Sequence, residues 1–205
     1  MNRTVLGILA SGRGSNLQAI LDAILAERLK AKIGVVISDN PAAPALKRVK
    51  GFDIATAVVE RQNYPDKHSF EQAVAAELNL HHAELVVLAG FMRILGSEFI
   101  SRFSGRIMNI HPSLLPAFPG LDAQAQAIRY GVKVSGCTVH FVDEGMDTGP
   151  IILQEAVPVL DDDTEHSLAE RILHVEHVLY PRAIGMYAEG RLQLSGRKVI
   201  ITEKR

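Results

Sequence analysis

The stretch Thr4-Val-Leu-Gly-Ile-Leu-Ala-Ser-Gly-Arg-Gly-Ser-Asn-Leu-Gln18 decides the fold class of this chain. A short apolar run, Thr4–Ala10, ends at a glycine turn, and leucine and isoleucine then recur at helical spacing through residues 15–30. Ser15 and Gln18 stand three residues apart, which predicts a capping box at the start of this helix. A buried strand that passes through a glycine turn into a helix is typical of βαβ proteins.

The same alternation continues along the first half of the chain. The sequence predicts further strands over 32–38, 54–59, 85–89 and 106–110, with helices over 41–50, 65–80 and 96–103. Strands that are apolar on both faces and alternate with helices indicate parallel βαβ units. We therefore expect an α/β, Rossmann-like fold with a mostly parallel central sheet and helices on both faces.

The pattern changes after Pro112. A proline- and glycine-rich loop to Gly120 precedes an expected helix over 121–130, two strands over 136–142 and 151–157, and a helix over 164–178. Pro181 is expected to start or kink a last helix that ends at Gly190. A terminal hairpin over 192–194 and 198–202 follows. Since no linker or repeat is present, one domain, 1–205, is the simplest organisation.

Composition restricts the class of protein. The chain has 205 residues, a formal net charge of −1 and a single cysteine, Cys137. The charge does not favour nucleic acid as a partner, and no apolar run is long enough to span a membrane. Cys137 is expected to be a small buried hydrophobe, and the start of the chain does not resemble a signal peptide. We expect a cytoplasmic protein and leave a monomer and a homodimer both open.

The glycine turn 11–16 is a candidate anion site. Free backbone N–H groups and the positive end of the helix dipole meet where the strand enters the helix. Gly12 and Gly14 match the start of a dinucleotide fingerprint, but Leu17 occupies the third glycine position, and no P-loop lysine follows. A monophosphate therefore fits better than a dinucleotide, while a capped tight turn without ligand is the plain structural alternative.

Asn109 and His111 end the expected strand before Pro112. Residues two apart point to the same face of a strand, so both side chains project together at the carboxyl edge, where α/β sheets bind ligands. An amide donor beside an imidazole can stabilise the oxyanion that forms in acyl transfer. A hydrogen-bonded structural pair is the alternative.

The loop 143–150 carries the carboxylates Asp143, Glu144 and Asp147. A carboxylate close to His111 would favour its protonated form, whereas a solvated acidic turn is the commoner role for such a run. The histidines lack the spacing of zinc ligands, so we expect no metal. The acidic run 161–163 is expected to be solvated at a helix start, where its charge suits the dipole.

Several motifs together resemble the folate-dependent formyltransferases. They are Leu88-Ala-Gly-Phe-Met-Arg-Ile-Leu95, Asn109-Ile-His-Pro-Ser-Leu-Leu-Pro116 and Asp147-Thr-Gly-Pro150, and the similarity runs from about Thr4 to Leu194. The turn 11–17 and the stretch Glu176–Pro181 resemble the members that act on glycinamide ribonucleotide. The resemblance implies a formyltransferase fold and transfer of a formyl group from 10-formyltetrahydrofolate to the amine of that ribonucleotide, a step in purine synthesis.

The resemblance also implies roles for individual residues. Asn109, His111 and Asp147 would form the catalytic trio. The ribonucleotide would contact Gly14, Ser15, Asn16 and Glu176. The folate would contact Lys67, Met92, Arg93, Ile94, Leu95, Asn109, Asp143, Glu144, Gly145, Met146 and Asp147. Lys67 stands where relatives often carry arginine, which keeps the charge and loses the planar fork. A nucleotide-binding half would cover about 1–105, and a folate and catalytic half about 106–205.

Three alternatives stay open. A methionyl-tRNA formyltransferase is expected to have an additional carboxyl-terminal domain and a basic surface. A formyltetrahydrofolate hydrolase is expected to have an amino-terminal regulatory domain and needs no phosphate-binding turn. A non-enzymatic nucleotide-binding protein would explain the glycine turn but would leave Asn109, His111 and Asp147 without a role.

Overall fold

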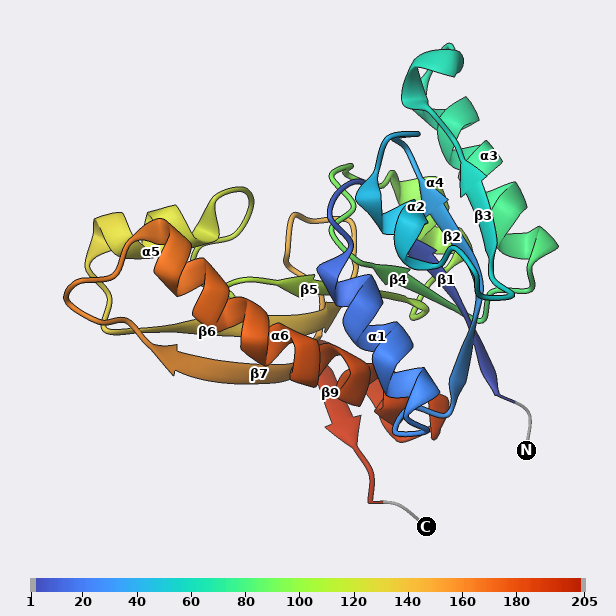
Figure 1. Cartoon of the computed structure of the whole chain (residues 1–205). Coiled ribbons are helices and arrows are strands. Elements are labelled where there is room, and N and C mark those ends of the chain that lie inside the picture. Colours follow the sequence, from blue (N-terminus) through green and yellow to red (C-terminus); the bar gives the residue numbers. More distant parts are fainter. Residues whose placement is uncertain (1–2, 204–205) are drawn as a thin grey trace. The chain divides into compact units, whose positions relative to one another are not determined.

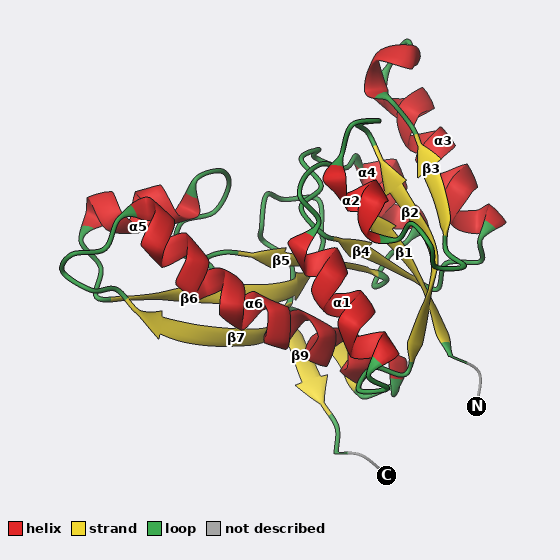
Figure 2. Ribbon diagram, in the orientation of Figure 1, coloured by secondary structure: helices red, strands yellow, loops and turns green. Residues whose placement is uncertain are grey.

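The computed structural model describes residues 3–203, and Figure 2 shows the expected alternation of strands and helices. The strands are β1 (Thr4–Leu9), β2 (Ala31–Ser38), β3 (Ala55–Val58), β4 (Leu85–Leu88), β5 (Ile107–His111), β6 (Val134–Phe141), β7 (Ile151–Pro158), β8 (Leu192–Ser195) and β9 (Lys198–Ile201). The helices are α1 (Ser15–Leu25), α2 (Pro44–Arg48), α3 (Lys67–Leu80), α4 (Ser97–Arg102), α5 (Ala123–Tyr130) and α6 (Glu165–Ala188), and Arg61–Asn63 is a 3₁₀ turn.

The strand order is β3-β2-β1-β4-β5-β6-β7, with β8 and β9 as a separate hairpin. β1 pairs in parallel with β2 and β4, β2 pairs in parallel with β3, and β6 pairs antiparallel with β7. The predicted α/β class with a mostly parallel sheet is therefore confirmed. By its internal contacts the chain forms two compact units, Met1–Met108 and Asn109–Arg205. The organisation of residues 1–205 as one domain stays a prediction, and its first and last two residues lie outside the described part of the chain.

In the first unit, helices cover both faces of the parallel strands. A side chain at Gly7 of β1 would collide with Leu78 of α3, so α3 packs closely on the face to which Gly7 points. Leu6 and Ile8 point to the opposite face, which α1 covers in Figure 1, and both are fully buried. This close packing from both sides explains why β1 is apolar from Val5 to Leu9 and needs glycine at one of these positions.

In the second unit, α6 packs along β6 and β7, as Figure 1 shows. Leu168, Ile172 and Ile184 of α6 are fully buried, and so is Cys137 of β6. Burial raises the pKa of the Cys137 thiol to about 12, as expected for a small buried hydrophobe. The hairpin β8–β9 is present as predicted, and β9 contacts β7.

Two expectations about helix ends are wrong. Gly14 caps α1 without a side-chain hydrogen bond, and Gln18 bonds to Asp22 one turn later, so the predicted capping box is absent at this described helix. Pro181 does not start a separate helix, since it lies inside the single helix α6; the alternative expectation of a kink at Pro181 stays a prediction. Proline removes one backbone donor and crowds the carbonyl four residues earlier, and the packing of α6 on β6 and β7 offsets this cost.

The acidic run 161–163 is only partly solvated. The side chain of Asp163 is 2% exposed and accepts two hydrogen bonds from Arg171, at 2.6 and 2.9 Å. These bonds hold the pKa of the Asp163 carboxyl below its usual range. Asp161 follows the expectation, being 90% exposed and paired with Lys133.

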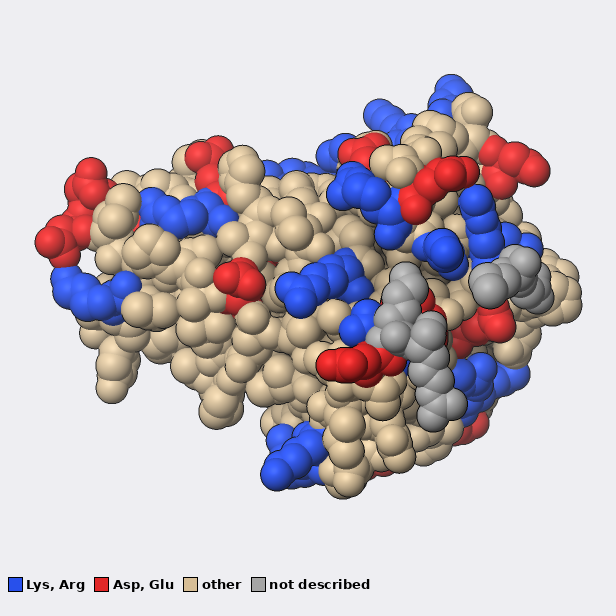
Figure 3. All heavy atoms as spheres, turned by 90° about the horizontal axis from the view of Figure 1, so that it is seen from below, with Lys and Arg blue, Asp and Glu red and all other residues tan. Residues whose placement is uncertain are grey.

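Charged side chains of both signs are interspersed on the face shown in Figure 3, and a broad area there carries neither sign. This distribution agrees with the near-neutral net charge of −1. Within residues 3–203, no helix combines the length and apolar character that crossing a membrane requires.

Candidate active site

The glycine turn of the first unit is held in shape by α2. Gly14 has φ 69°, and a Cβ at this position would lie 2.7 Å from the Cβ of Ala45, so only glycine fits. The N–H of Ala45 donates to the carbonyl of Gly12 at 3.1 Å, and Arg48 Nε donates to the carbonyl of Arg13 at 2.6 Å. These contacts fix the turn at the amino end of α1, where the first N–H groups have no acceptor one turn earlier. The geometry suits an anion.

The His111 ring, at the end of β5, faces the loops of the second unit. The His111 side chain is 6% exposed, its Nε2 lies 2.8 Å from the carbonyl oxygen of Phe118, and its Nδ1 lies 3.3 Å from Oδ2 of Asp147. Both neighbours accept hydrogen bonds. A neutral imidazole can donate to one of them only, whereas the protonated ring can donate to both.

Asp147 reaches this position through an unusual backbone conformation. Its φ is 54°, in the left-handed region that aspartate tolerates better than most residues. The carboxylate is 14% exposed, and Oδ2 accepts the N–H of Gly120 at 2.8 Å as well as facing His111. The loop that carries Asp147 thus approaches His111, as the family resemblance implied.

His140 of β6 joins Asn109 to the same cluster. Its Nδ1 lies 2.9 Å from the carbonyl oxygen of Phe141, its Nε2 lies 3.2 Å from Nδ2 of Asn109, and the same Nε2 lies 3.7 Å from Oδ1 of Asp147. Burial lowers the pKa of His140, which favours the neutral ring. The structure therefore brings four polar side chains together in the second unit.

The loop 143–150 is organised by Asp143. Its Oδ1 accepts the hydroxyl of Thr148 at 2.6 Å and the N–H of Gly145 at 3.2 Å. A Cβ on Gly145 would collide with Thr148, and one on Gly149 would collide with the carbonyl of Phe141. Asp143 and the two glycines therefore shape the turn that presents Asp147.

Comparison with known proteins identifies the family. Residues 5–184 match the family model described as formyl transferase. The chain belongs to the formyl transferase family. This formyl transferase is 47% identical over 177 residues to phosphoribosylglycinamide formyltransferase of Bacillus subtilis, covering 86% of this chain and 91% of the relative.

Solved structures of the family have the same fold. The glycinamide ribonucleotide transformylase 1 of Symbiobacterium toebii matches with a TM-score of 0.96 and 49% identity, over 98% of this chain and 95% of that chain. A formyltetrahydrofolate deformylase of Pseudomonas syringae matches with a TM-score of 0.92 and 29% identity, over 98% of this chain and 67% of that one.

The other residues that the family resemblance singled out are distributed over both units of this formyl transferase. The first unit contains Gly14, Ser15, Asn16, Lys67, Met92, Arg93, Ile94 and Leu95; the second contains Asp143, Glu144, Gly145, Met146 and Glu176. Glu176 is 6% exposed, whereas Met92, Ile94 and Met146 are 71%, 68% and 55% exposed. Such exposed apolar side chains are available to contact a ligand.

Three groups of the cluster were not predicted as site residues: the His140 ring, the Phe118 carbonyl and the Gly120 N–H. His140 carries a signal that could have found it, because a polar residue in an otherwise buried strand needs a partner. The other two are backbone groups, which the residue type does not reveal. Among the described residues of this formyl transferase, no group of three or more His, Cys, Asp or Glu is placed to hold a metal ion.

Proposed function

We propose that this formyl transferase moves the formyl group of 10-formyltetrahydrofolate to the amine of 5′-phosphoribosylglycinamide, giving the N-formyl ribonucleotide and tetrahydrofolate in purine synthesis. The observation that carries the proposal is the cluster in which Asp147 lies 3.3 Å from His111 and Asn109 lies 3.2 Å from His140. Relatives named for this reaction, 47% and 49% identical to the chain, support the choice of substrates.

The reaction is a direct transfer without a protein-acyl intermediate. The substrate amine attacks the formyl carbon, a C–N bond forms, and the carbonyl electrons move to oxygen. The amide N–H of Asn109 donates to this oxyanion, and the protonated ring of His111, whose two N–H groups face Phe118 and Asp147, stabilises it through its positive charge. Collapse of the intermediate breaks the bond to N10 of the folate, which takes up a proton. Asp147 places its carboxylate 3.3 Å from the His111 ring and helps to relay the proton lost by the amine through water.

The two substrates bind to different groups of residues. Gly14, Ser15 and Asn16 hold the phosphate at the amino end of α1, where N–H groups and the helix dipole favour an anion. Glu176 contacts the ribonucleotide. Loop 92–95, Lys67 and loop 143–147 contact the folate, which acts as a co-substrate. Holding both substrates in line lowers the barrier through proximity.

An absorbance assay with purified protein tests the proposal. The formyl donor is mixed with the protein alone, with glycinamide ribonucleotide, and with a simple amine. We expect tetrahydrofolate to appear only with the ribonucleotide. Product formed without any amine would instead support a deformylase, the activity named for the structure at 29% identity. No turnover under any condition would support a nucleotide-binding protein.

A further inference from the structure

The loop between β4 and α4 is pinned near its start by a side chain from another segment of the first unit. The hydroxyl of Ser11 accepts the N–H of Met92 at 2.9 Å, and the Ser11 N–H donates to the carbonyl of Gly90 at 3.0 Å. Arg93 donates to Asp39 at 2.6 Å, and the Asp39 side chain is 7% exposed. The first half of the loop is thus tied to the ends of β1 and β2.

Glu71 of α3 holds the other end of the loop. Its Oε1 accepts the N–H of Gly96 at 2.7 Å and lies 3.8 Å from Nζ of Lys67. The Glu71 side chain is only 9% exposed, whereas that of Lys67 is 50% exposed. One buried carboxylate therefore contacts both the end of the loop and the lysine, and a charged hydrogen bond of this kind is among the stronger contacts in proteins.

Between these anchors the backbone is available to a ligand. The N–H groups of Arg93, Ile94 and Leu95 have no hydrogen-bond acceptor within residues 3–203. The side chain of Ile94 is 68% exposed, while that of Leu95 is buried. The loop is thus fixed at its ends by side chains and leaves its central donors unpaired.

We infer that Glu71 is a positioning residue for the folate, holding Lys67 and the backbone of loop 92–95 in one fixed arrangement. The inference rests on the proposed function, which assigns the folate to these groups. A loop ordered before binding loses less conformational entropy when the ligand arrives, so its anchors contribute to affinity without touching the ligand.

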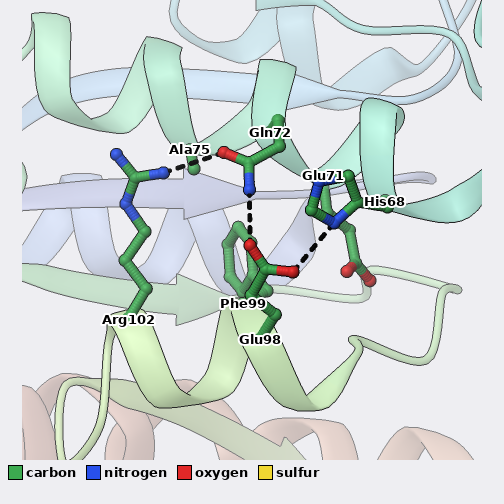
Figure 4. A pocket seen from close by; sticks show the side chains of 7 residues that line it. All are labelled: His68, Glu71, Gln72, Ala75, Glu98, Phe99 and Arg102. Carbon is green, nitrogen blue, oxygen red and sulfur yellow. Dashed lines mark hydrogen bonds and ion pairs between the residues drawn. The ribbon is translucent and has the colours of Figure 1, made fainter.

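The packing of α3 on α4 has side-chain contacts in addition to the bond between Glu71 and Gly96. Figure 4 shows a separate polar network, in which Glu98 accepts from Gln72 and lies 2.9 Å from His68, while Arg102 donates to Gln72. Glu71 takes no part in the contacts drawn there. Because this network remains when Glu71 is replaced, the effect of a Glu71 variant on folate binding can be separated from loss of the helix pair.

The variants Glu71→Met and Glu71→Gln test the inference, with Glu98→Gln as the matched control. Three measurements are made on each protein: hydrogen exchange of the Gly96 amide by NMR, the Kd of unreactive 5-formyltetrahydrofolate by calorimetry, and steady-state kinetics for kcat and both KM values. Glu71→Met removes both contacts. Glu71→Gln keeps an acceptor for Gly96 and removes only the charge that faces Lys67.

In Glu71→Met we expect faster exchange at Gly96 and a folate Kd raised on the order of tenfold, with the ribonucleotide KM and saturated kcat unchanged. In Glu71→Gln, Gly96 stays protected and the folate Kd rises roughly twofold to threefold, as for one partly exposed ion pair. Glu98→Gln should match the wild type in all three measurements.

A wild-type folate Kd in Glu71→Met, with Gly96 protection lost, would overturn the inference. Should Glu71→Met not fold, an unchanged Kd in Glu71→Gln would overturn it instead. Exchange and folate binding need no acceptor, so a wild-type protein that binds folate but does not formylate the ribonucleotide would refute the proposed function alone.

Discussion

The side-chain amide of Asn109 donates to Nε2 of His140 across 3.2 Å. The direction of this bond follows from the other ring nitrogen: Nδ1 faces the carbonyl of Phe141 at 2.9 Å and must carry the proton, because a carbonyl only accepts. Nε2 is then left with a lone pair, and burial, which lowers the pKa of His140, favours this neutral state. His140 thereby fixes which way the Asn109 amide points and leaves its second N–H available to the formyl oxygen.

Replacing His140 should therefore slow the chemical step. In His140→Leu the Asn109 amide can rotate, and we expect kcat to fall on the order of tenfold to a hundredfold, less than for loss of an oxyanion donor itself. Both KM values should change little, because the amide acts mainly in the transition state. Steady-state kinetics measure kcat and both KM values separately. His166→Leu, on the exposed face of α6, is the control. An unchanged kcat in a folded His140→Leu protein would contradict this role.

The same residue should make folding stability depend on pH. The pKa of His140 is lowered in the folded state, so below about 6.5 the unfolded chain binds a proton that the folded chain does not. His140 thus destabilises the protein progressively as pH falls through that value, until the folded state is protonated as well. Urea unfolding of the wild type and of His140→Gln from pH 8 to 5 measures this difference, and the wild type should lose more stability. If the stabilities of the two proteins changed equally with pH, the His140 ring would protonate equally in the folded and unfolded states.

The shared position of Asn109 and His111 could be anticipated because strand periodicity and parallel topology place such residues together at one edge. The place of Asp147 beside them was implied by the family resemblance, because its loop joins two antiparallel strands. His140 was missed although Thr138 and His140 stand two apart on β6, the same spacing that drew attention to Asn109 and His111. Two polar residues on one face of a buried strand carry the same signal in both cases.

Other features had no signal in residue type. The carbonyl of Phe118 and the N–H of Gly120 belong to a loop whose path is set by tertiary contacts, including the Thr138 hydroxyl that accepts from Leu115. Likewise, nothing in three successive aspartates indicates that Asp163 pairs with Arg171, eight residues later. Helical spacing allows many partners, and packing selects one.

Asp147→Asn tests the charge of the carboxylate separately from its place in the loop. Asparagine also tolerates the left-handed backbone at φ 54°, and its carbonyl oxygen can still accept the Gly120 N–H. What is lost is the negative charge that faces His111. We expect kcat to fall roughly a hundredfold to ten-thousandfold, as for loss of a general acid–base group, with ribonucleotide affinity nearly unchanged. Stopped-flow turnover and calorimetric binding measure the two effects, and equal losses in both would indicate a binding role.

Gly14→Ala tests the anion site, and Gly12→Ala in the same turn is its matched control. At Gly14 the backbone has φ 69°, and a new Cβ would lie 2.7 Å from the Cβ and 2.8 Å from the Cα of Ala45. At Gly12 nothing lies within 4 Å of a new Cβ, and φ is not positive. Alanine at 14 must therefore shift the amino end of α1 or push α2 away, at a cost of about 1–3 kcal/mol.

Because the displaced N–H groups are the ones proposed to hold the phosphate, Gly14→Ala should raise the KM for the ribonucleotide and leave the folate Kd unchanged. Thermal unfolding should show the loss of stability in Gly14→Ala only. The KM for free glycinamide riboside, which lacks the phosphate, separates the two effects: a shifted phosphate site should leave that KM unaltered. If Gly14→Ala raised the KM for the ribonucleotide and the KM for the riboside equally, the turn would act through the fold rather than through the phosphate.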